Sequence, residues 1–213
     1  MNFSLSTAAK LVIPPVVPMF VRWCKAFQNR GRLFNGEDDL FFEFASNATA
    51  YAEYGCGAST IWIGENTNLP LITVDTSGAW IGHVKSRIKR IEGVNCLYFN
   101  MGAIGDWGRP LGYQVRQNFI NYVEGPWTHG QLSDFVLIDG RFRVACFLTT
   151  LLRANAGTII LFDDYIGRPH FHLVEEFVPI FKVNSRQAAF IVPAKIDRNL
   201  IEAQRDKFLF VME

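Results

Sequence analysis

The chain alternates between short apolar runs and amphipathic segments, and this alternation limits the folds that it can adopt. Apolar residues recur at helical spacing in 79–91 and 143–154. Strands that are apolar on both faces and alternate with helices are typical of a parallel sheet covered on both sides. The sequence therefore predicts an α/β domain with a Rossmann-like, doubly wound, mostly parallel seven-stranded sheet and helices on both faces. Five of its strands are expected at 50–54, 71–75, 96–99, 134–138 and 158–162.

The length and the remaining segments indicate a single domain. At 213 residues the chain is long enough for one large core. The secondary structure of residues 197–213 is left open. We expect an N-terminal extension over residues 1–36 and one α/β domain over residues 37–213. Further helices are expected at 38–46, from Ala58 onward, near 113–122 and at about 170–181, with another strand at 190–192.

Residues 1–36 are both basic and apolar. They hold five basic residues and no acidic one, and three prolines interrupt the apolar run 11–21. That run is half of the ~20 residues that a membrane-spanning helix needs, so no transmembrane segment is expected. The prolines also prevent a continuous amphipathic helix at a membrane surface. We expect this extension to pack over the surface of the domain or across a dimer.

Charge and cysteine usage exclude several classes of protein. After residue 36 the chain has 16 basic and 20 acidic residues, so its main body lacks the positive field of a nucleic-acid-binding surface. The four cysteines have no short metal or redox spacing, and they are expected to be reduced thiols of a cytoplasmic protein. The mean hydropathy of +0.11 is high for a soluble chain and favours a homodimer that covers apolar surface.

A glycine-rich turn follows the first predicted strand. Gly55 and Gly57 let the backbone turn tightly and approach a ligand closely, and the helix start at Ala58 and Ser59 offers free N–H groups to polar atoms. Asp75 ends the next strand, twenty positions after Gly55. There its carboxylate is placed to accept hydrogen bonds from both hydroxyls of a ribose. The pattern predicts a nucleoside-containing ligand.

The details of the turn separate the classes of nucleoside ligand. A dinucleotide fingerprint needs a third glycine where this chain has Thr60. Glu53, just before the turn, would repel a pyrophosphate, but it is suited to balance the ammonium of an amino-acid-bearing ligand. A nicotinamide-dependent oxidoreductase is therefore disfavoured.

The motif E-Y-G-C-G-A-S-T, followed by a strand that ends in Asp75, resembles the first two motifs of class I S-adenosylmethionine-dependent methyltransferases. The resemblance covers residues 38–192 and implies S-adenosylmethionine as the cofactor. It implies that Glu53 helps to hold the methionine ammonium, that the glycine turn passes under the methionine moiety and that Asp75 binds the ribose. It also implies that Gly102 and Ala103 lie near the adenine. The implied cofactor contacts are Glu53, Gly55, Cys56, Gly57, Ser59, Asp75, Thr76, Gly102, Ala103 and Asp139.

Three aspartates follow two neighbouring strands. Asp139 follows the fourth predicted strand, and Asp163 and Asp164 follow the fifth. Adjacent strand ends face one crevice, so three unpaired carboxylates there would raise one another's pKa unless cations relieve them. Mg²⁺ is one such cation, and the pattern resembles metal-dependent O-methyltransferases, in which these acids bind the ion. Basic side chains are the other relief, and they require no metal. The candidates are Arg141, Arg143 and Arg168.

The resemblance implies methyl transfer to an oxygen or nitrogen of a small-molecule acceptor. The stretch V-L-I-D-G-R-F-R-V-A-C, with R-P-H-F-H downstream, also resembles a bacterial methyltransferase-like branch of this superfamily. Asp139 is expected at the centre of the site, with Arg141 or His170 contacting the acceptor. His170 and His172 are candidate general bases because the histidine pKa lies near working pH, although a histidine at a helix start is also a common packing residue. The alternative is a cofactor-binding protein of the same fold without catalytic activity.

Overall fold

A seven-stranded sheet forms the centre of the protein. The computed structural model describes residues 32–212, and the expectations for residues 1–31 lie outside the described part. The strand order is β3-β2-β1-β4-β5-β7-β6, with the first five strands of that order parallel and the last two antiparallel to their neighbours. This arrangement confirms the predicted mostly parallel sheet. The strands are β1 (Tyr51–Tyr54), β2 (Leu71–Asp75), β3 (Val94–Tyr98), β4 (Phe135–Ile138), β5 (Ile159–Phe162), β6 (Lys182–Val183) and β7 (Ala188–Ile191).

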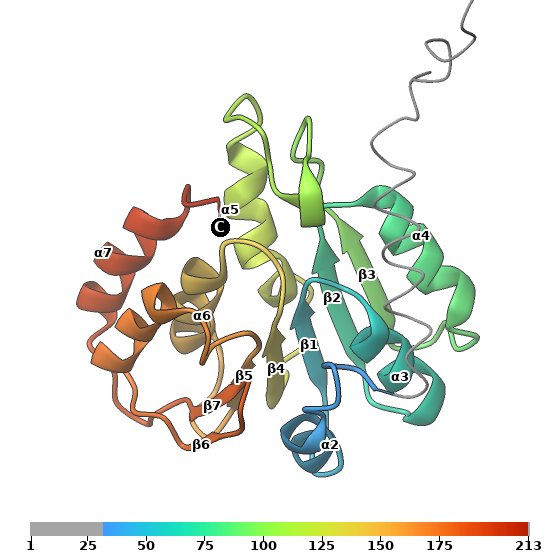
Figure 1. Cartoon of the computed structure of the whole chain (residues 1–213), viewed down its shortest axis with the longest axis horizontal. Coiled ribbons are helices and arrows are strands. Elements are labelled where there is room, and N and C mark those ends of the chain that lie inside the picture. Colours follow the sequence, from blue (N-terminus) through green and yellow to red (C-terminus); the bar gives the residue numbers. More distant parts are fainter. Residues whose placement is uncertain (1–31, 213) are drawn as a thin grey trace, which may run out of the picture. The chain divides into compact units, whose positions relative to one another are not determined.

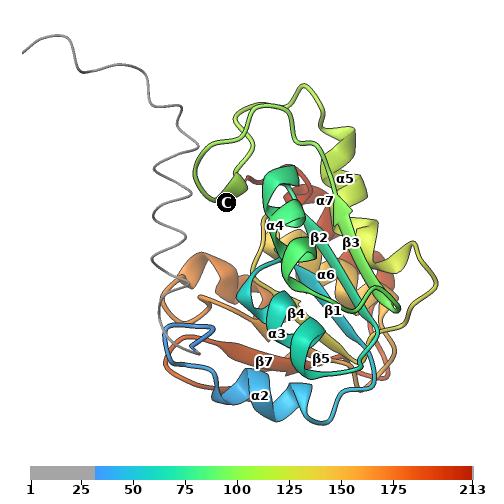
Figure 2. The same cartoon turned by 90° about the vertical axis from the view of Figure 1, so that its right-hand side faces the viewer.

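Helices cover both faces of the sheet, as predicted (Figures 1 and 2). One layer consists of α2 (Asp39–Ala45), α3 (Ala58–Asn66) and α4 (Gly78–Arg87). The other layer consists of α5 (Gln117–Glu124), α6 (Arg143–Arg153) and α7 (Arg198–Phe208). Within residues 32–212 there are also three 3₁₀ helices: η1 (Asp106–Gly108), η2 (Gly125–Trp127) and η3 (Pro169–Glu176).

The core follows from the apolar strands. Every residue of β1 and β4 is buried, because a parallel strand in the middle of a sheet is covered on both faces. Beneath α2, the Phe135 ring packs against the rings of Phe41 and Tyr51. On the opposite face, the Phe147 ring of α6 contacts Phe162. The two aromatic layers hold the central strands, and with them the turns that follow those strands.

Several segments differ from their predicted form. The helix expected over 79–91 ends at Arg87, because Ile88 leaves it to pack against Gly64 and Arg90 donates to the Leu69 carbonyl. The segment near 170–181 is the 3₁₀ helix η3 rather than an α-helix. The segment left open over 197–213 forms α7, whose first turn is capped by the Asp197 side chain at the Leu200 N–H.

Residues just after the described part begins already pack on the domain. The Asp38 carboxylate accepts hydrogen bonds from the N–H groups of Leu33 and Phe34, and the Phe34 ring is buried against Phe41. The compact unit accordingly begins at Arg32. The role expected for residues 1–36 as an extension stays a prediction. In residues 32–212, no helix has the length and apolar character needed to cross a membrane.

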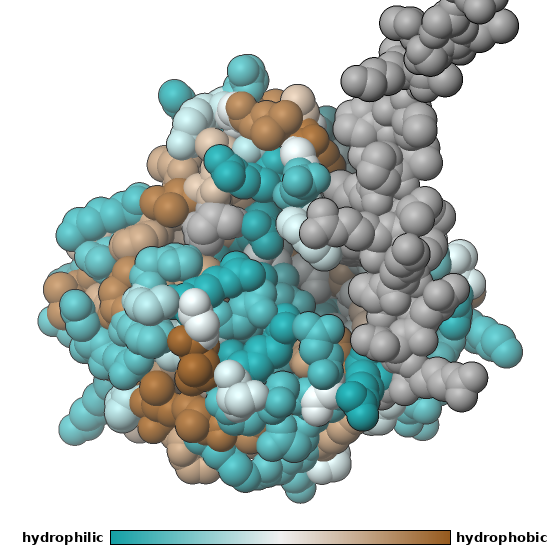
Figure 3. Space-filling model, viewed as in Figure 1, coloured by the Kyte–Doolittle hydropathy of each residue, from teal (hydrophilic) through white to brown (hydrophobic). Residues whose placement is uncertain are grey.

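Apolar side chains are exposed at the β6 edge of the sheet. Hydrophobic residues gather at the lower left of Figure 3, on the side where Figure 1 places β6 and β7. Phe181 and Val183 are about half exposed there, and Lys182 between them pairs with Glu43 of α2. A charged residue on a two-residue edge strand disfavours pairing with another sheet. The homodimer and the cytoplasmic location stay predictions.

Candidate functional site

The turns after the parallel strands share one edge of the sheet. The strand order reverses at β1, which lies between β2 and β4, so the connections after β1 and β4 leave in opposite directions. In open α/β sheets this reversal leaves a crevice at the carboxyl ends of the strands, where ligands bind. Most of the residues singled out from the sequence lie in these turns.

The turns after β1 and β4 touch backbone to backbone. Gly55 has φ +91°, and a Cβ on it would lie 2.6 Å from the Cα of Gly140. The Asp139 N–H donates to the Tyr54 carbonyl at 2.9 Å, which holds the second turn against the first. A Cβ on Gly57 would meet no described atom within 4 Å. Gly55 is therefore needed for packing, whereas Gly57 presents open backbone to the crevice.

Asp75 ties the turns after β1 and β2 together. Its Oδ2 accepts a hydrogen bond from the Cys56 N–H at 3.0 Å, and its Oδ1 accepts one from the Ser77 N–H at 2.7 Å. Burial raises the pKa of Asp75 to about 6. A carboxylate has about four acceptor positions, so beyond these two hydrogen bonds Asp75 can still accept from donors such as the hydroxyls of a ribose. The residues present thus fit the predicted nucleoside contact.

Glu53 lies beneath the glycine turn and is fully buried. Its two oxygens accept hydrogen bonds from the hydroxyls of Ser59 and Thr60, at the start of α3. Burial raises the pKa of Glu53 to about 7. In the structure the side chains of Glu53 and Ser59 therefore hydrogen-bond to each other inside the turn. Their contacts with a ligand stay predictions.

The other predicted cofactor residues form the walls around this turn. Cys56 is buried, and its carbonyl accepts a hydrogen bond from the Trp80 indole of α4. The Thr76 hydroxyl donates to the Gly108 carbonyl at 2.9 Å, which ties the turn after β2 to the loop after β3. The sequence analysis did not identify Trp80, because a tryptophan in an amphipathic helix is ordinarily a core residue.

Gly102 and Ala103 lie in the loop after β3, where the sequence analysis expected an adenine. Both are exposed, and Gly102 has φ +74°. The Gly102 N–H donates to the Asn100 side chain at 2.9 Å, which shapes the start of this loop. The loop is at the same edge of the sheet as Asp75, so the predicted adenine contact is compatible with the fold.

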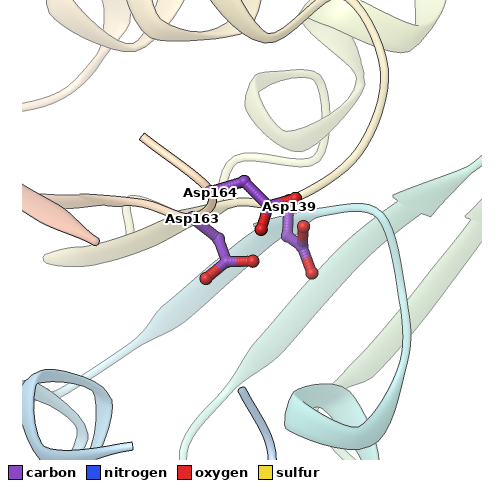
Figure 4. A group of neighbouring side chains, drawn as sticks. All are labelled: Asp139, Asp163 and Asp164. Carbon is purple, nitrogen blue, oxygen red and sulfur yellow. The ribbon is translucent and has the colours of Figure 1, made fainter. Parts of the chain in front are cut away.

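The three aspartates converge as expected (Figure 4). One oxygen from each of Asp139, Asp163 and Asp164 lies within 4.8 Å of the others. They come from the turns after β4 and β5, and Asp164 has φ +54°, a left-handed conformation that is uncommon for a residue with a side chain. The sequence correctly placed the cluster, and it left open whether a metal or basic side chains balance the charge.

Three arginines balance the three aspartates. Arg186, from the segment between β6 and β7, donates from Nε to Asp163 Oδ1 at 2.8 Å and also pairs with Asp164. Arg168 lies 2.6 Å from Asp164. Arg143, which is buried, lies 3.0 Å from Asp139 Oδ1. The pairing of Arg143 and Arg168 was among the expected alternatives, whereas Arg186 was missed because its approach depends on strands that are distant in sequence.

This charge balance gives no support to the expected metal role of Asp163. Its carboxylate is fully buried, and it accepts hydrogen bonds from Arg186 and, at 2.8 Å, from the Gln187 amide. An ion there would have to displace these donors, so the arrangement does not support a Mg²⁺ requirement. The metal contacts of Asp139, Asp163 and Asp164 stay predictions.

Magnesium is therefore expected to leave the protein unchanged. Only a ligand that binds the folded state raises its stability. Adding Mg²⁺ or a chelator at matched ionic strength should shift the melting temperature by less than about 1 °C. Differential scanning fluorimetry measures this shift. A rise of several degrees that Asp163→Asn abolishes would restore the metal interpretation.

The candidate acceptor residues follow the same two strands, β4 and β5, as the aspartates. The Arg141 backbone N–H donates to the Tyr122 hydroxyl at 3.3 Å, in the turn that carries Asp139. His170 is exposed in η3, the helix that follows the turn after β5. His172 stacks on the Tyr165 ring, which is a packing role. The acceptor contacts of Arg141 and His170 stay predictions.

The chain is similar to solved structures of other proteins. A methyltransferase-like protein from Silicibacter pomeroyi DSS-3 is 31% identical with a TM-score of 0.74, over 81% of this chain and 93% of that chain. A cofactor-bound protein from MTB is 15% identical with a TM-score of 0.55, over 90% of this chain and 95% of that chain. The N-methyltransferase NodS from Bradyrhizobium japonicum WM9, in complex with S-adenosyl-L-homocysteine, is 13% identical with a TM-score of 0.49, over 81% and 97%. No family model and no curated protein matches the chain.

Proposed function

Because the chain belongs to the class I S-adenosylmethionine-dependent methyltransferase superfamily, we propose that it binds S-adenosylmethionine and transfers the methyl group to an oxygen or nitrogen of a small molecule. The observation that carries this proposal is the position of Asp75. It ends β2 beside the reversal point of the sheet, holds the Cys56 N–H of the glycine turn and keeps acceptor capacity for a ribose. Gly57 leaves the adjacent backbone open to a ligand.

The proposed acceptor site lies at Asp139, next to the glycine turn. When bound, S-adenosylmethionine supplies an electrophilic methyl group on a sulfonium. The acceptor oxygen or nitrogen bonds to that carbon as the S–C bond breaks, S-adenosylhomocysteine leaves, and the acceptor gives up its proton. Burial and the neighbouring Asp163 raise the pKa of Asp139 well above its usual range, which makes its carboxylate a stronger proton acceptor than an ordinary aspartate. Arg141 and His170 are proposed to orient the acceptor, since positioning supplies much of such catalysis.

Cofactor binding is the first test. Saturation at a hundred times the dissociation constant stabilises a protein by about 2.7 kcal/mol, which raises the melting temperature of a domain of this size by roughly 5–10 °C. S-adenosylmethionine and S-adenosylhomocysteine are both expected to give such a shift. Asp75→Asn should weaken either ligand at least about tenfold, because hydrogen bonds to a charged acceptor contribute ~1.5–3 kcal/mol each.

Asp106→Asn is the matched control, because Asp106 is an exposed acid in the loop after β3 at the same edge of the sheet. It should leave ligand affinity unchanged. A shift with a nicotinamide dinucleotide but none with S-adenosylhomocysteine would overturn the proposal. Turnover is tested by following S-adenosylhomocysteine formed from S-adenosylmethionine in a small-molecule extract. Loss of that product in Asp139→Asn separates an enzyme from a non-catalytic cofactor-binding protein.

A further inference from the structure

The Thr60 hydroxyl connects the glycine turn to a buried acid. Thr60 lies in the first turn of α3, and its Oγ1 accepts a hydrogen bond from the Gly57 N–H at 2.8 Å. The same hydroxyl donates its hydrogen to Glu53. Glu53 is fully buried, and its other oxygen accepts from Ser59. The backbone that faces the crevice is thus held by a relay that ends on a carboxylate.

The surroundings of Glu53 keep its ionisation sensitive to pH. Burial is the largest influence, and it raises the pKa of Glu53 to about 7, while the Ser59 and Thr60 hydroxyls oppose it. The charge of Asp75 on β2 raises that pKa further. The other titratable groups that interact with Glu53 are Tyr51 on β1, Cys56 in the turn and Cys96 on β3.

We propose that Thr60 and Glu53 are a proton-linked pair of positioning residues, which hold the turn for its ligand when Glu53 is ionised and release it when Glu53 is protonated. This inference rests on the proposed function, because the ligand at the turn is taken to be the S-adenosyl cofactor. It goes further, because it assigns Thr60 a role and makes cofactor affinity depend on pH. Neither residue needs to touch the reacting atoms.

Hydrogen-bond chemistry explains the two states. An ionised carboxylate only accepts hydrogen bonds, so it takes both hydroxyl hydrogens and leaves the lone pairs of Thr60 to the Gly57 N–H. A protonated carboxyl donates its own hydrogen, and the hydroxyl that faces it must turn its own hydrogen away to accept. When that hydroxyl belongs to Thr60, its oxygen accepts from both the carboxyl and the Gly57 N–H, so the hydrogen of Thr60 no longer fixes the orientation in which it holds the turn. A ligand that carries an ammonium or a sulfonium also favours the ionised acid, so its binding releases a proton.

The sign of the pH dependence follows from this linkage. Affinity is greatest above the pKa of Glu53 in the free protein, and it falls as pH drops through that value. Binding linked to one proton loses up to about tenfold in affinity per pH unit. Isothermal titration with S-adenosylhomocysteine should therefore give roughly tenfold weaker binding at about pH 6 than at about pH 8. Asp75, with a pKa of about 6, adds about a twofold change over that interval.

Variants separate the pair from the rest of the site. Glu53→Gln should reduce the pH dependence to the small contribution of Asp75. Thr60→Val removes a donor to Glu53, so binding should weaken and the midpoint of its pH dependence should move upward. Thr60→Ser keeps the hydroxyl and should restore the wild-type profile. The matched control is Thr67→Val, because the Thr67 hydroxyl donates to the Ile63 carbonyl at the opposite end of α3.

Each outcome of the titration is decisive. Proton release, measured in buffers of different ionisation enthalpy, that disappears in Glu53→Gln supports the pair. A pH-independent affinity in the wild type, or a Thr60→Val profile equal to that of Thr67→Val, overturns it. If Thr60→Val does not fold, the pH profiles of Glu53→Gln and Thr60→Ser are compared with the wild-type profile. A pH dependence that persists in Glu53→Gln then overturns the proposal. No binding of S-adenosylhomocysteine at any pH overturns the proposed function instead.

Discussion

Gly55→Ala is expected to lower the free energy of unfolding by about 3 kcal/mol or more. Gly55 has φ +91°, which L side chains rarely adopt, and the added Cβ would lie 2.6 Å from the Cα of Gly140. The nearest atoms are all backbone, so no side chain can rotate away. An unfavourable backbone conformation costs ~1–3 kcal/mol, and overpacking costs about as much again. The melting temperature should fall by roughly 10 °C, as measured by calorimetry or chemical denaturation.

Gly57→Ala is the control that separates packing from ligand binding. The added Cβ would meet no described atom within 4 Å, and the φ of −172° is open to any residue. Stability should therefore change by less than about 1 kcal/mol. If the cofactor lies against this backbone, as proposed, the same methyl group should weaken S-adenosylhomocysteine binding by about tenfold or more. Equal stability losses in the two variants would contradict this division of roles.

The sequence was informative where local chemistry sets the structure. Strands β1 and β4 are apolar throughout, and burial on both faces of a parallel sheet requires this pattern. Asp75 was found by its spacing from the glycine turn, because both positions are strand ends brought to one edge by parallel pairing. The aspartate cluster was found in the same way. These predictions needed only the order of the elements.

The sequence was uninformative where structure depends on distant partners. Strand β6 has two residues, and it exists because Lys182 and Val183 pair with Ala189 and Ala188 of β7. Arg186, in the connection between these strands, reaches Asp163 for the same reason. No local pattern marks a residue whose role depends on such pairing. The sequence therefore left a metal and basic side chains as alternatives, and the folded chain brings three arginines to the aspartates, of which only Arg186 was not foreseen.

The buried arginine of this cluster supports the second large prediction. Arg143 donates to Asp139 Oδ1 at 3.0 Å, and it also donates to the carbonyls of Gly140 at 3.0 Å and Asp163 at 2.7 Å. It therefore connects the turn after β4 to the turn after β5. Arg143→Met keeps much of the volume but leaves Asp139 and both carbonyls without this donor. Removing one partner of a fully buried ion pair costs ~3–5 kcal/mol, and because the Asp139 side chain is 33% exposed, we expect a loss at the lower end of that range at neutral pH.

The control for Arg143→Met is Arg153→Met, at the other end of α6. Arg153 pairs with Glu124 at 3.0 Å, but its side chain is 46% exposed. Exposed pairs contribute ~0.2–1 kcal/mol, so this variant should lose little stability. Chemical denaturation of both variants beside the wild type measures the difference. Similar losses in the two would show that the position of Arg143 between the turns has no special importance.

The stability deficit of Arg143→Met should also depend on pH. In the wild type, burial and Asp163 raise the pKa of Asp139, and Arg143 opposes them. Without Arg143 that pKa rises further, so the folded variant holds a proton that the unfolded chain releases at lower pH. A group whose pKa is raised by folding stabilises the folded state at low pH. That stabilisation is lost as pH rises through the pKa of the group in the folded state. The deficit should therefore be larger at about pH 8 than at about pH 5. A deficit that is constant over this range would show that the lost carbonyl hydrogen bonds, not the unpaired charge of Asp139, account for the instability.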